Sequence, residues 1–178
     1  RTQTALFNDS YNALTVPLQN GDSVEQVFYT DEDLYSLLFM FEKEADFAGA
    51  VTLKVYDHPS GVLLQTTSRS DIEAFLPGIY TPFVLESPVQ GRAGGAYHIQ
   101  LTLQTADAAA SLCLAKSAEA ALANGILWEN GQKTAGTLTF IAAVAKLDFA
   151  LFRTLYFVFG LFGAAFLQVA YMAVFIKK

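Results

Sequence analysis

The sequence has 178 residues, of which 53 % are hydrophobic, and its formal net charge is −6. This length suits one domain with an appendage. Residues 1–146 hold 16 acidic against 8 basic residues, whereas residues 147–178 hold 1 against 3. The acidic part lacks the basic footprint that nucleic-acid phosphates require, so we expect no nucleic-acid partner.

Alternation of apolar and polar residues predicts β-strands along residues 1–146. The clearest alternation lies at 97–104, in AYHIQLTLQT, and others lie at 51–57 and 137–144. Residues 34–41 form a nearly continuous apolar run, which predicts a strand that is covered on both faces. Phenylalanines on these strands are expected in the core, while Cys113, in the run SLCLA, is expected to act as a small buried hydrophobe.

Turn signals separate the predicted strands at short intervals, and the sequence WENGQKT predicts a tight hairpin at Asn130-Gly131. Only two short pieces look helical. Ser70–Phe75 carries Ser70 and Glu73 at the spacing of a capping box, and Ser117–Asn124 is rich in alanine. Many short strands at this spacing predict an antiparallel β-sandwich or jelly roll over residues 1–146.

Aromatic residues at turns and strand ends form one set of candidate ligand-binding residues. Aromatic faces beside polar groups can hold carbohydrate, although such rings also simply cap a sandwich. The candidates are Tyr29, Tyr35, Tyr56, Tyr80 and Trp128.

Acidic residues cluster before and after the apolar strand at 34–41. Asp31, Glu32 and Asp33 are oxygen donors in one loop, which suits Ca²⁺, but the loop lacks the glycine and spacing of an EF-hand. Solvated loop acids are the simpler interpretation. The sequence contains no G-x-S-x-G elbow and no phosphate-binding loop, and its two histidines lie at His58 and His98. We therefore expect a protein that is not an enzyme, with Ca²⁺ as its one candidate cofactor.

The end of the chain predicts a transmembrane helix within residues 147–178. Thr154–Ile176 contains 23 residues without a charge, and a helix of that length covers about 34 Å, enough for a bilayer core of about 30 Å. Lys177 and Lys178 close this run, which favours a cytoplasmic C-terminus, although Arg153 places a positive charge at its other end. Residues 1–146 are then extracytoplasmic, and membrane lipid is a partner.

One face of the predicted span suggests contact with further helices. Gly160, Ala164 and Gln168 recur every four residues, so they share a helix face. Small residues allow close helix approach, and a lone Gln in hydrocarbon seeks a hydrogen-bond partner. The alternative is a single anchor with incidental small residues. The chain begins at Arg1 and not at Met, so either an N-terminal part was removed or the chain is an excerpt, and its end at Lys178, where a span would leave the bilayer, favours an excerpt of a multi-span membrane protein.

The order of strands and turns carries a resemblance to a known class. It runs through QVFYTDEDLYSLLFMFE, AGAVTLKVYDHPSGVLLQTT, IYTPFVLESPV, GGAYHIQLTL and ILWENGQKTAGTLTF. This pattern over residues 25–140 resembles the extracytoplasmic β-sandwich domains inserted between transmembrane spans of bacterial cell-envelope proteins of the glycan-assembly type. The resemblance implies a bacterial envelope location and a glycan partner, and it carries over no functional residue.

Three hypotheses for function follow from the sequence. The first is a membrane-tethered module that binds or positions a cell-envelope polysaccharide. The second is a structural or partner-binding ectodomain of a membrane complex without a glycan site. The third and weakest is an extracytoplasmic hydrolase, which would need a converging pair of carboxylates in a cleft.

Overall fold

The computed structural model describes residues 6–8, 11–119 and 125–143. The chain divides into two units, Arg1–Ala145 and Lys146–Lys178, and every described residue belongs to the first. The predicted span at 147–178, with Gly160, Ala164 and Gln168, lies outside the described residues. Among the residues that are described, no helix has both the length and the apolar character needed to cross a membrane.

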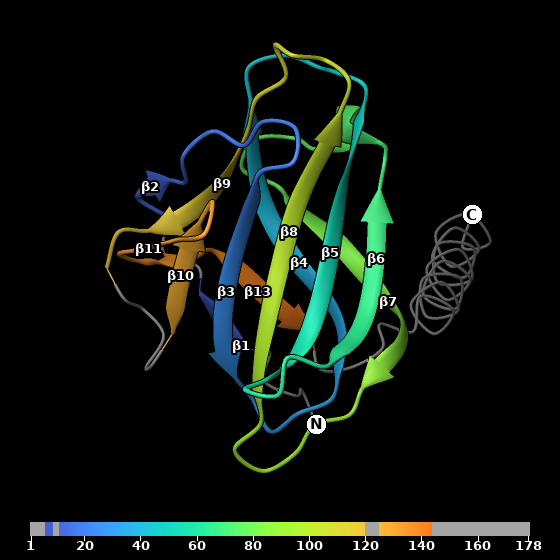
Figure 1. Cartoon of the computed structure of the whole chain (residues 1–178), viewed down its shortest axis with the longest axis vertical. Helices are drawn as coiled ribbons and strands as arrows, with labels where there is room; N and C mark the ends of the chain where they lie inside the picture. The colour runs from blue at the N-terminus through green and yellow to red at the C-terminus, as the bar shows by residue number, and fades with distance from the viewer. Residues whose placement is uncertain (1–5, 9–10, 120–124, 144–178) are drawn as a thin grey trace, which may run out of the picture. The chain divides into compact units, whose positions relative to one another are not determined.

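The described residues form two antiparallel sheets that face each other (Figure 1). One is a seven-stranded sheet in the order β1-β13-β4-β9-β12, with β2 beside β9 and β7 beside β4. The other is a six-stranded sheet in the order β11-β10-β3-β8-β5-β6. The elements are β1 (Leu6–Asn8), β2 (Ala13–Leu14), β3 (Ser23–Tyr29), β4 (Leu34–Lys43), β5 (Gly49–His58), β6 (Leu63–Arg69), the 3₁₀ turn η1 (Ile72–Ala74), β7 (Tyr80–Val89), β8 (Ala96–Thr105), β9 (Leu112–Ser117), β10 (Ile126–Glu129), β11 (Gln132–Thr134), β12 (Thr137–Leu138) and β13 (Phe140–Ala143).

Successive strands alternate between the two sheets from β2 to β9, apart from the β5–β6 hairpin. As a result, β2, β9, β4 and β7 are neighbours in one sheet, and β3, β8, β5 and β6 are neighbours in the other. The prediction of a mainly β, sandwich-like fold is confirmed. The predicted hairpin also forms between β10 and β11, with Asn130 at φ 52° and Gly131 at φ 75°, the positive values that a primed turn requires.

The core lies between the sheets and follows the predicted alternation. On β8 the buried side chains are Tyr97, Ile99, Leu101 and Leu103, while the intervening residues are polar and face outward. Six phenylalanines interlock across the sheets, with ring centroids 4.7 to 6.4 Å apart. Each fully buried ring stabilises the fold by about 1.5–3 kcal/mol. These rings are Phe28, Phe39, Phe41, Phe75, Phe83 and Phe140.

Some local predictions differ from the structure. The strand expected at 137–144 breaks at Thr139, because β12 pairs with β9 whereas β13 pairs with β4. The capping box expected at Ser70 does not form, since η1 begins after Asp71 and has no side-chain cap. Asp71 instead pairs with Arg69. Ser117 ends β9, and residues 120–124 of the second expected helix lie outside the described part.

A largely buried ion pair joins the two sheets, and no pattern in the sequence indicated it. Glu129 of β10 has a side chain only 2 % exposed and pairs with Lys116 of β9. The Val16 N–H donates to Glu129 Oε2 at 2.7 Å, and the Thr134 hydroxyl donates to Oε1 at 3.0 Å. Burial acts to raise the pKa of Glu129, but the Lys116, Val16 and Thr134 hydrogen bonds outweigh it and lower that pKa.

Candidate functional site

The outer face of the six-stranded sheet carries a group of aromatic and polar side chains, which we call the aromatic face. Cross-strand pairing places Tyr56 beside His98. It also places Glu25 between Trp128 on one side and Gln100 on the other. All five are partly exposed, because they occupy the outward positions of the pleat. The aromatic face comprises Tyr29, Tyr56, His98, Trp128, Glu25 and Gln100.

Three rings of the aromatic face form a continuous row across β5, β8 and β10. Tyr56 stacks on His98 with centroids 5.5 Å apart and planes at 28°. His98 meets Trp128 edge to face, with centroids 5.9 Å apart and planes at 62°. Because each ring restrains the next, the row offers a preformed aromatic platform and not three independent side chains.

Hydrogen bonds fix the polar part of the same face. His98 Nε2 lies 2.9 Å from Glu25 Oε2, and Gln100 donates to Glu25 Oε1 at 3.0 Å. The Tyr56 hydroxyl donates to Gln100 Oε1 at 3.4 Å. Glu25 therefore holds His98 and Gln100 of β8, and through them it positions the ring row. The platform combines ring faces with fixed donors and acceptors.

The five aromatic candidates from the sequence separate between the two sheets. Tyr29, Tyr56 and Trp128 all occupy outward positions of the six-stranded sheet, with Tyr29 at the end of β3 and 42 % exposed. Tyr35 and Tyr80 belong to β4 and β7 of the seven-stranded sheet. Sequence reasoning missed His98, Glu25 and Gln100 as members of the group. The polar positions of β8 were visible in the sequence, but their cross-strand neighbours were not.

The three acidic candidates for Ca²⁺ lie on the exposed loop between β3 and β4. All three residues are exposed; Asp33 Oδ1 accepts the Gly91 N–H at 2.7 Å, and Asp31 Oδ1 accepts the Gly94 N–H at 2.7 Å. Two of the carboxylates thus fasten the glycine-rich loop that leads from β7 to β8. In the described part of the chain, no group of three or more His, Cys, Asp or Glu residues is placed to hold a metal ion.

Cys113 lies on β9, where it pairs with Glu42 of β4. It is half-buried, not fully buried as expected. Burial raises the pKa of its thiol, and the carboxylates of Glu44, Glu42 and Glu129 raise it further. The thiol is therefore protonated at neutral pH, which is the opposite of what a catalytic cysteine needs.

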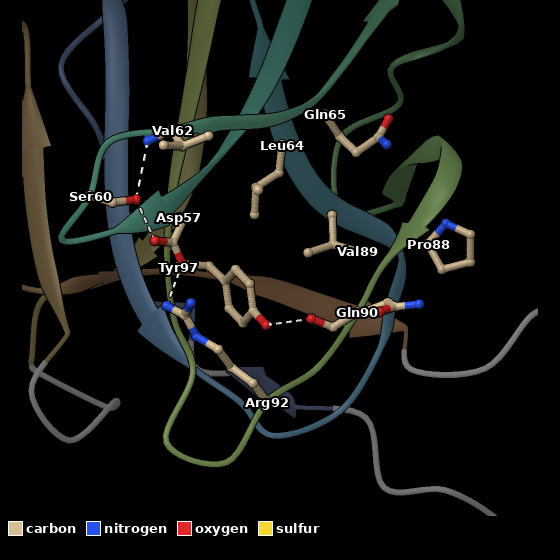
Figure 2. Close-up of a pocket in the computed structure, with 10 residues that line it drawn as sticks. All are labelled: Asp57, Ser60, Val62, Leu64, Gln65, Pro88, Val89, Gln90, Arg92 and Tyr97. Carbon is tan, nitrogen blue, oxygen red and sulfur yellow. Dashed lines mark hydrogen bonds and ion pairs between the residues drawn. The ribbon is translucent and has the colours of Figure 1, made fainter.

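A separate cavity opens beside Tyr97, with a volume of about 430 Å³ (Figure 2). Its residues come from the β5–β6 hairpin, the end of β7 and the loop that follows β7. Asp57 pairs with Arg92 at one end, and the Tyr97 hydroxyl donates to the Gln90 carbonyl at 3.0 Å. Burial raises the pKa of Tyr97, so this hydroxyl keeps its proton. The volume lies within the range usual for small-ligand sites.

No family model matches the chain, and no curated protein matches it. The functional argument therefore depends on the two sites described above.

Proposed function

We propose that this chain is a membrane-tethered, extracytoplasmic module whose aromatic face binds or positions a cell-envelope glycan, as part of a multi-span membrane protein. The observation that carries the proposal is the row Tyr56, His98 and Trp128, supported by Glu25. Sugar rings present an apolar face edged by hydroxyl groups, and the aromatic face offers ring surfaces edged by fixed polar groups.

The strand order agrees with this proposal. The orders β2-β9-β4-β7 and β3-β8-β5-β6, with alternation between sheets, are those we expect of a jelly roll, a fold that lectin domains use. Fold alone does not give function, so the order supports only the scaffold. The strongly acidic balance of residues 1–146 favours a glycan of low negative charge over a polyanionic one.

Trp128 is the only tryptophan in the chain, so its fluorescence reports directly on this face. The test is a titration of the full chain in detergent micelles with purified envelope polysaccharides, with and without Ca²⁺. We expect a saturable shift of the Trp128 emission for at least one neutral polysaccharide. A requirement for Ca²⁺ would support the loop of Asp31, Glu32 and Asp33 as a metal site.

Two matched variants make the titration specific. Tyr56→Ala removes a ring from the aromatic face, and we expect it to weaken binding about tenfold, because one stacked ring contributes about 1 kcal/mol or more. Tyr80→Ala removes a predicted aromatic from the other sheet, and we expect binding to remain. Equal loss in both variants, or no emission change with any polysaccharide, would refute the glycan hypothesis.

A partner-binding ectodomain is the second candidate function. The observation that favours it is an apolar patch on the outer face of the seven-stranded sheet, where Val84 is 67 % exposed and the half-buried Leu38 lies opposite Pro82. Apolar surface of this kind suits a protein partner more than a sugar. Retention of a protein partner by the wild-type chain, and its loss in Val84→Lys, would support this function.

The membrane location is tested independently of ligand binding. In a Cys113→Ser background, a cysteine introduced by Val84→Cys is exposed and reacts readily. We expect an impermeant maleimide to label it in intact cells, and the chain to float with membranes in a density gradient. Labelling only after lysis would contradict the extracytoplasmic assignment.

A further inference from the structure

The cavity of Figure 2 lies between the edge strands of the two sheets. Two hydrogen bonds join these strands: Gln65 of β6 donates to Ser87 Oγ of β7 at 2.7 Å, and Arg69 donates to the Pro82 carbonyl at 3.0 Å. Gln65 of this bridge lines the cavity together with Val62 and Gln90. It is therefore a cleft at one end of the β6/β7 seam, which we call the seam cleft.

The walls of the seam cleft are aliphatic. Leu64, Val89 and the Tyr97 ring point into the same space in Figure 2, and Pro88 lies at its side. Leu64 packs against the core, and Tyr97 is only 2 % exposed, so no ring face is free for stacking on a sugar ring. Val62 at the opening is 58 % exposed, which leaves the cleft accessible. The shape suits a small apolar group and not a pyranose face.

The polar groups of the cleft are mostly satisfied, with one exception. Asp57 accepts from Ser60 and from Arg92, so its negative charge is compensated within the site. Arg92 contacts Asp57 and the His58 carbonyl through a single terminal nitrogen. Among the described residues, no partner occupies the remaining N–H groups of Arg92. Asp31 and Asp33 hold the loop that carries Arg92, and the pair with Asp57 places the guanidinium of this side chain, which is 55 % exposed, at the cleft.

We propose that the seam cleft is a second ligand site, and that it takes an acyl-amide group such as the acetamido substituent of an amino sugar or the acetyl cap of a peptide. The methyl group packs against Leu64 and Val89. The carbonyl oxygen accepts from the free N–H groups of Arg92. The amide N–H donates to Gln65 Oε1. This oxygen serves as the acceptor because Gln65 uses its Nε2 to donate to Ser87.

Charge supports a neutral ligand at this site. An anionic ligand would compete with Asp57 for Arg92 and would enter a domain that is already strongly acidic. A neutral acyl-amide group uses the free donors of Arg92 without breaking the Asp57 pair. The seam cleft shares no residue with the aromatic face, so this inference stands independently of the proposed function.

Saturation-transfer NMR on the full chain in detergent micelles tests the inference. The probes are the N-acetylglucosamine trimer, the glucose trimer, which lacks acetamido groups, and N-acetyl-alanyl-alanine amide as the peptide source. We expect the strongest saturation on an acetyl methyl group. A response to the N-acetylglucosamine trimer alone indicates that the ligand is a glycan, and a response to the peptide alone indicates that it is a peptide. A response to both indicates that the site recognises the acyl-amide group itself. Each of these three results supports the site.

A matched pair of tryptophan variants locates the binding. Val62→Trp fills the cleft opening from an exposed position, and we expect it to reduce the acetyl-methyl signal more than about tenfold. Val84→Trp makes the same change at an exposed valine outside the cleft, and we expect the signal to remain. An unchanged signal in Val62→Trp, equal saturation by the glucose trimer, or no signal from either acetylated probe would overturn the inference. The Tyr56→Ala titration is unaffected by any of these results.

Discussion

The outer faces of the two sheets differ sharply, although both sheets cover the same core. On the six-stranded sheet, the outward residues Glu25, His98 and Gln100 form a hydrogen-bonded group beside aromatic rings. On the seven-stranded sheet, Leu38 lies between Pro82 and Ile141, and no charged residue takes part in that row. The inward positions are apolar in both sheets because the core requires it. The outward positions do not have to be apolar, so the two sheets differ in chemistry at these positions.

The largest effect is expected where the two sheets are joined. Glu129→Ala leaves the Lys116 ammonium, whose side chain is 15 % exposed, without its partner, and we expect a loss of about 3–5 kcal/mol in the free energy of unfolding, because an unpaired and largely buried charge is costly. Chemical denaturation followed by circular dichroism measures it. Glu86→Ala, at an exposed position of β7, is the control and should change stability by less than about 0.5 kcal/mol. Equal effects would show that the pair does not join the sheets.

The same pair predicts how stability depends on pH. The folded state lowers the pKa of Glu129 below its ordinary value of 4.5, so its contribution is present above that value and is lost as the pH falls through the lowered pKa. We expect the difference in unfolding free energy between the wild type and Glu129→Gln to be largest near neutral pH and to shrink in acid. A difference that stays constant down to acidic pH would contradict the lowered pKa.

A smaller effect is expected in the loop that leads from the seven-stranded to the six-stranded sheet. A Cβ at Gly91 would lie 2.2 Å from the Asp31 carbonyl oxygen, which is backbone and cannot move aside easily. We expect Gly91→Ala to cost about 1–3 kcal/mol, as other overpacked sites do. Gly21→Ala is a useful comparison, because it meets no atom within 4 Å and tests only the strain of φ 86°. If Gly91→Ala is the milder change, the close approach is not what requires glycine.

The smallest effects on stability are expected from substitutions on the two outer faces. Val84→Lys places a charge on the outer face of the seven-stranded sheet, at a side chain that is already 67 % exposed. We expect the free energy of unfolding to change by less than about 0.5 kcal/mol. Glu25→Leu on the aromatic face removes the partner of His98 and Gln100, and we expect a loss of about 1–2 kcal/mol. Thermal denaturation compares the two. A greater loss of stability in Val84→Lys than in Glu25→Leu would mean that Val84 contributes to the core.

Period-two alternation made the inward residues of β5 and β8 predictable, because a strand with one buried face must alternate. It also made the Asn130-Gly131 hairpin predictable, since few residues adopt its positive φ values. The break at Thr139 was not predictable, because it arises where two short strands pair with different neighbours. The capping box at Ser70 failed because the 3₁₀ turn begins later than expected, so that Asp71 and not Ser70 stands at its N-cap, where the Asp71 carboxylate pairs with Arg69.

The candidate sites, like the fold, were predictable from the sequence only in part. Tyr56 and Trp128 could be selected as exposed aromatics, but their meeting across His98 depends on strands far apart in the sequence. The seam cleft was not predictable at all. Its donor, Arg92, stands in a glycine-rich loop that looked unremarkable, and its walls come from the edges of both sheets.

The sequence by itself determined that residues 1–146 are β-rich and acidic, and which side chains of the clearest strands face inward, because alternation and turn chemistry are local. Only the tertiary structure decided which outward residues meet. Cross-strand register brought Glu25 to His98 and Gln100, and alternation between sheets brought Glu129 to Lys116. These contacts join residues 13 to 75 positions apart, and such pairings are set by long-range strand register that no local pattern records.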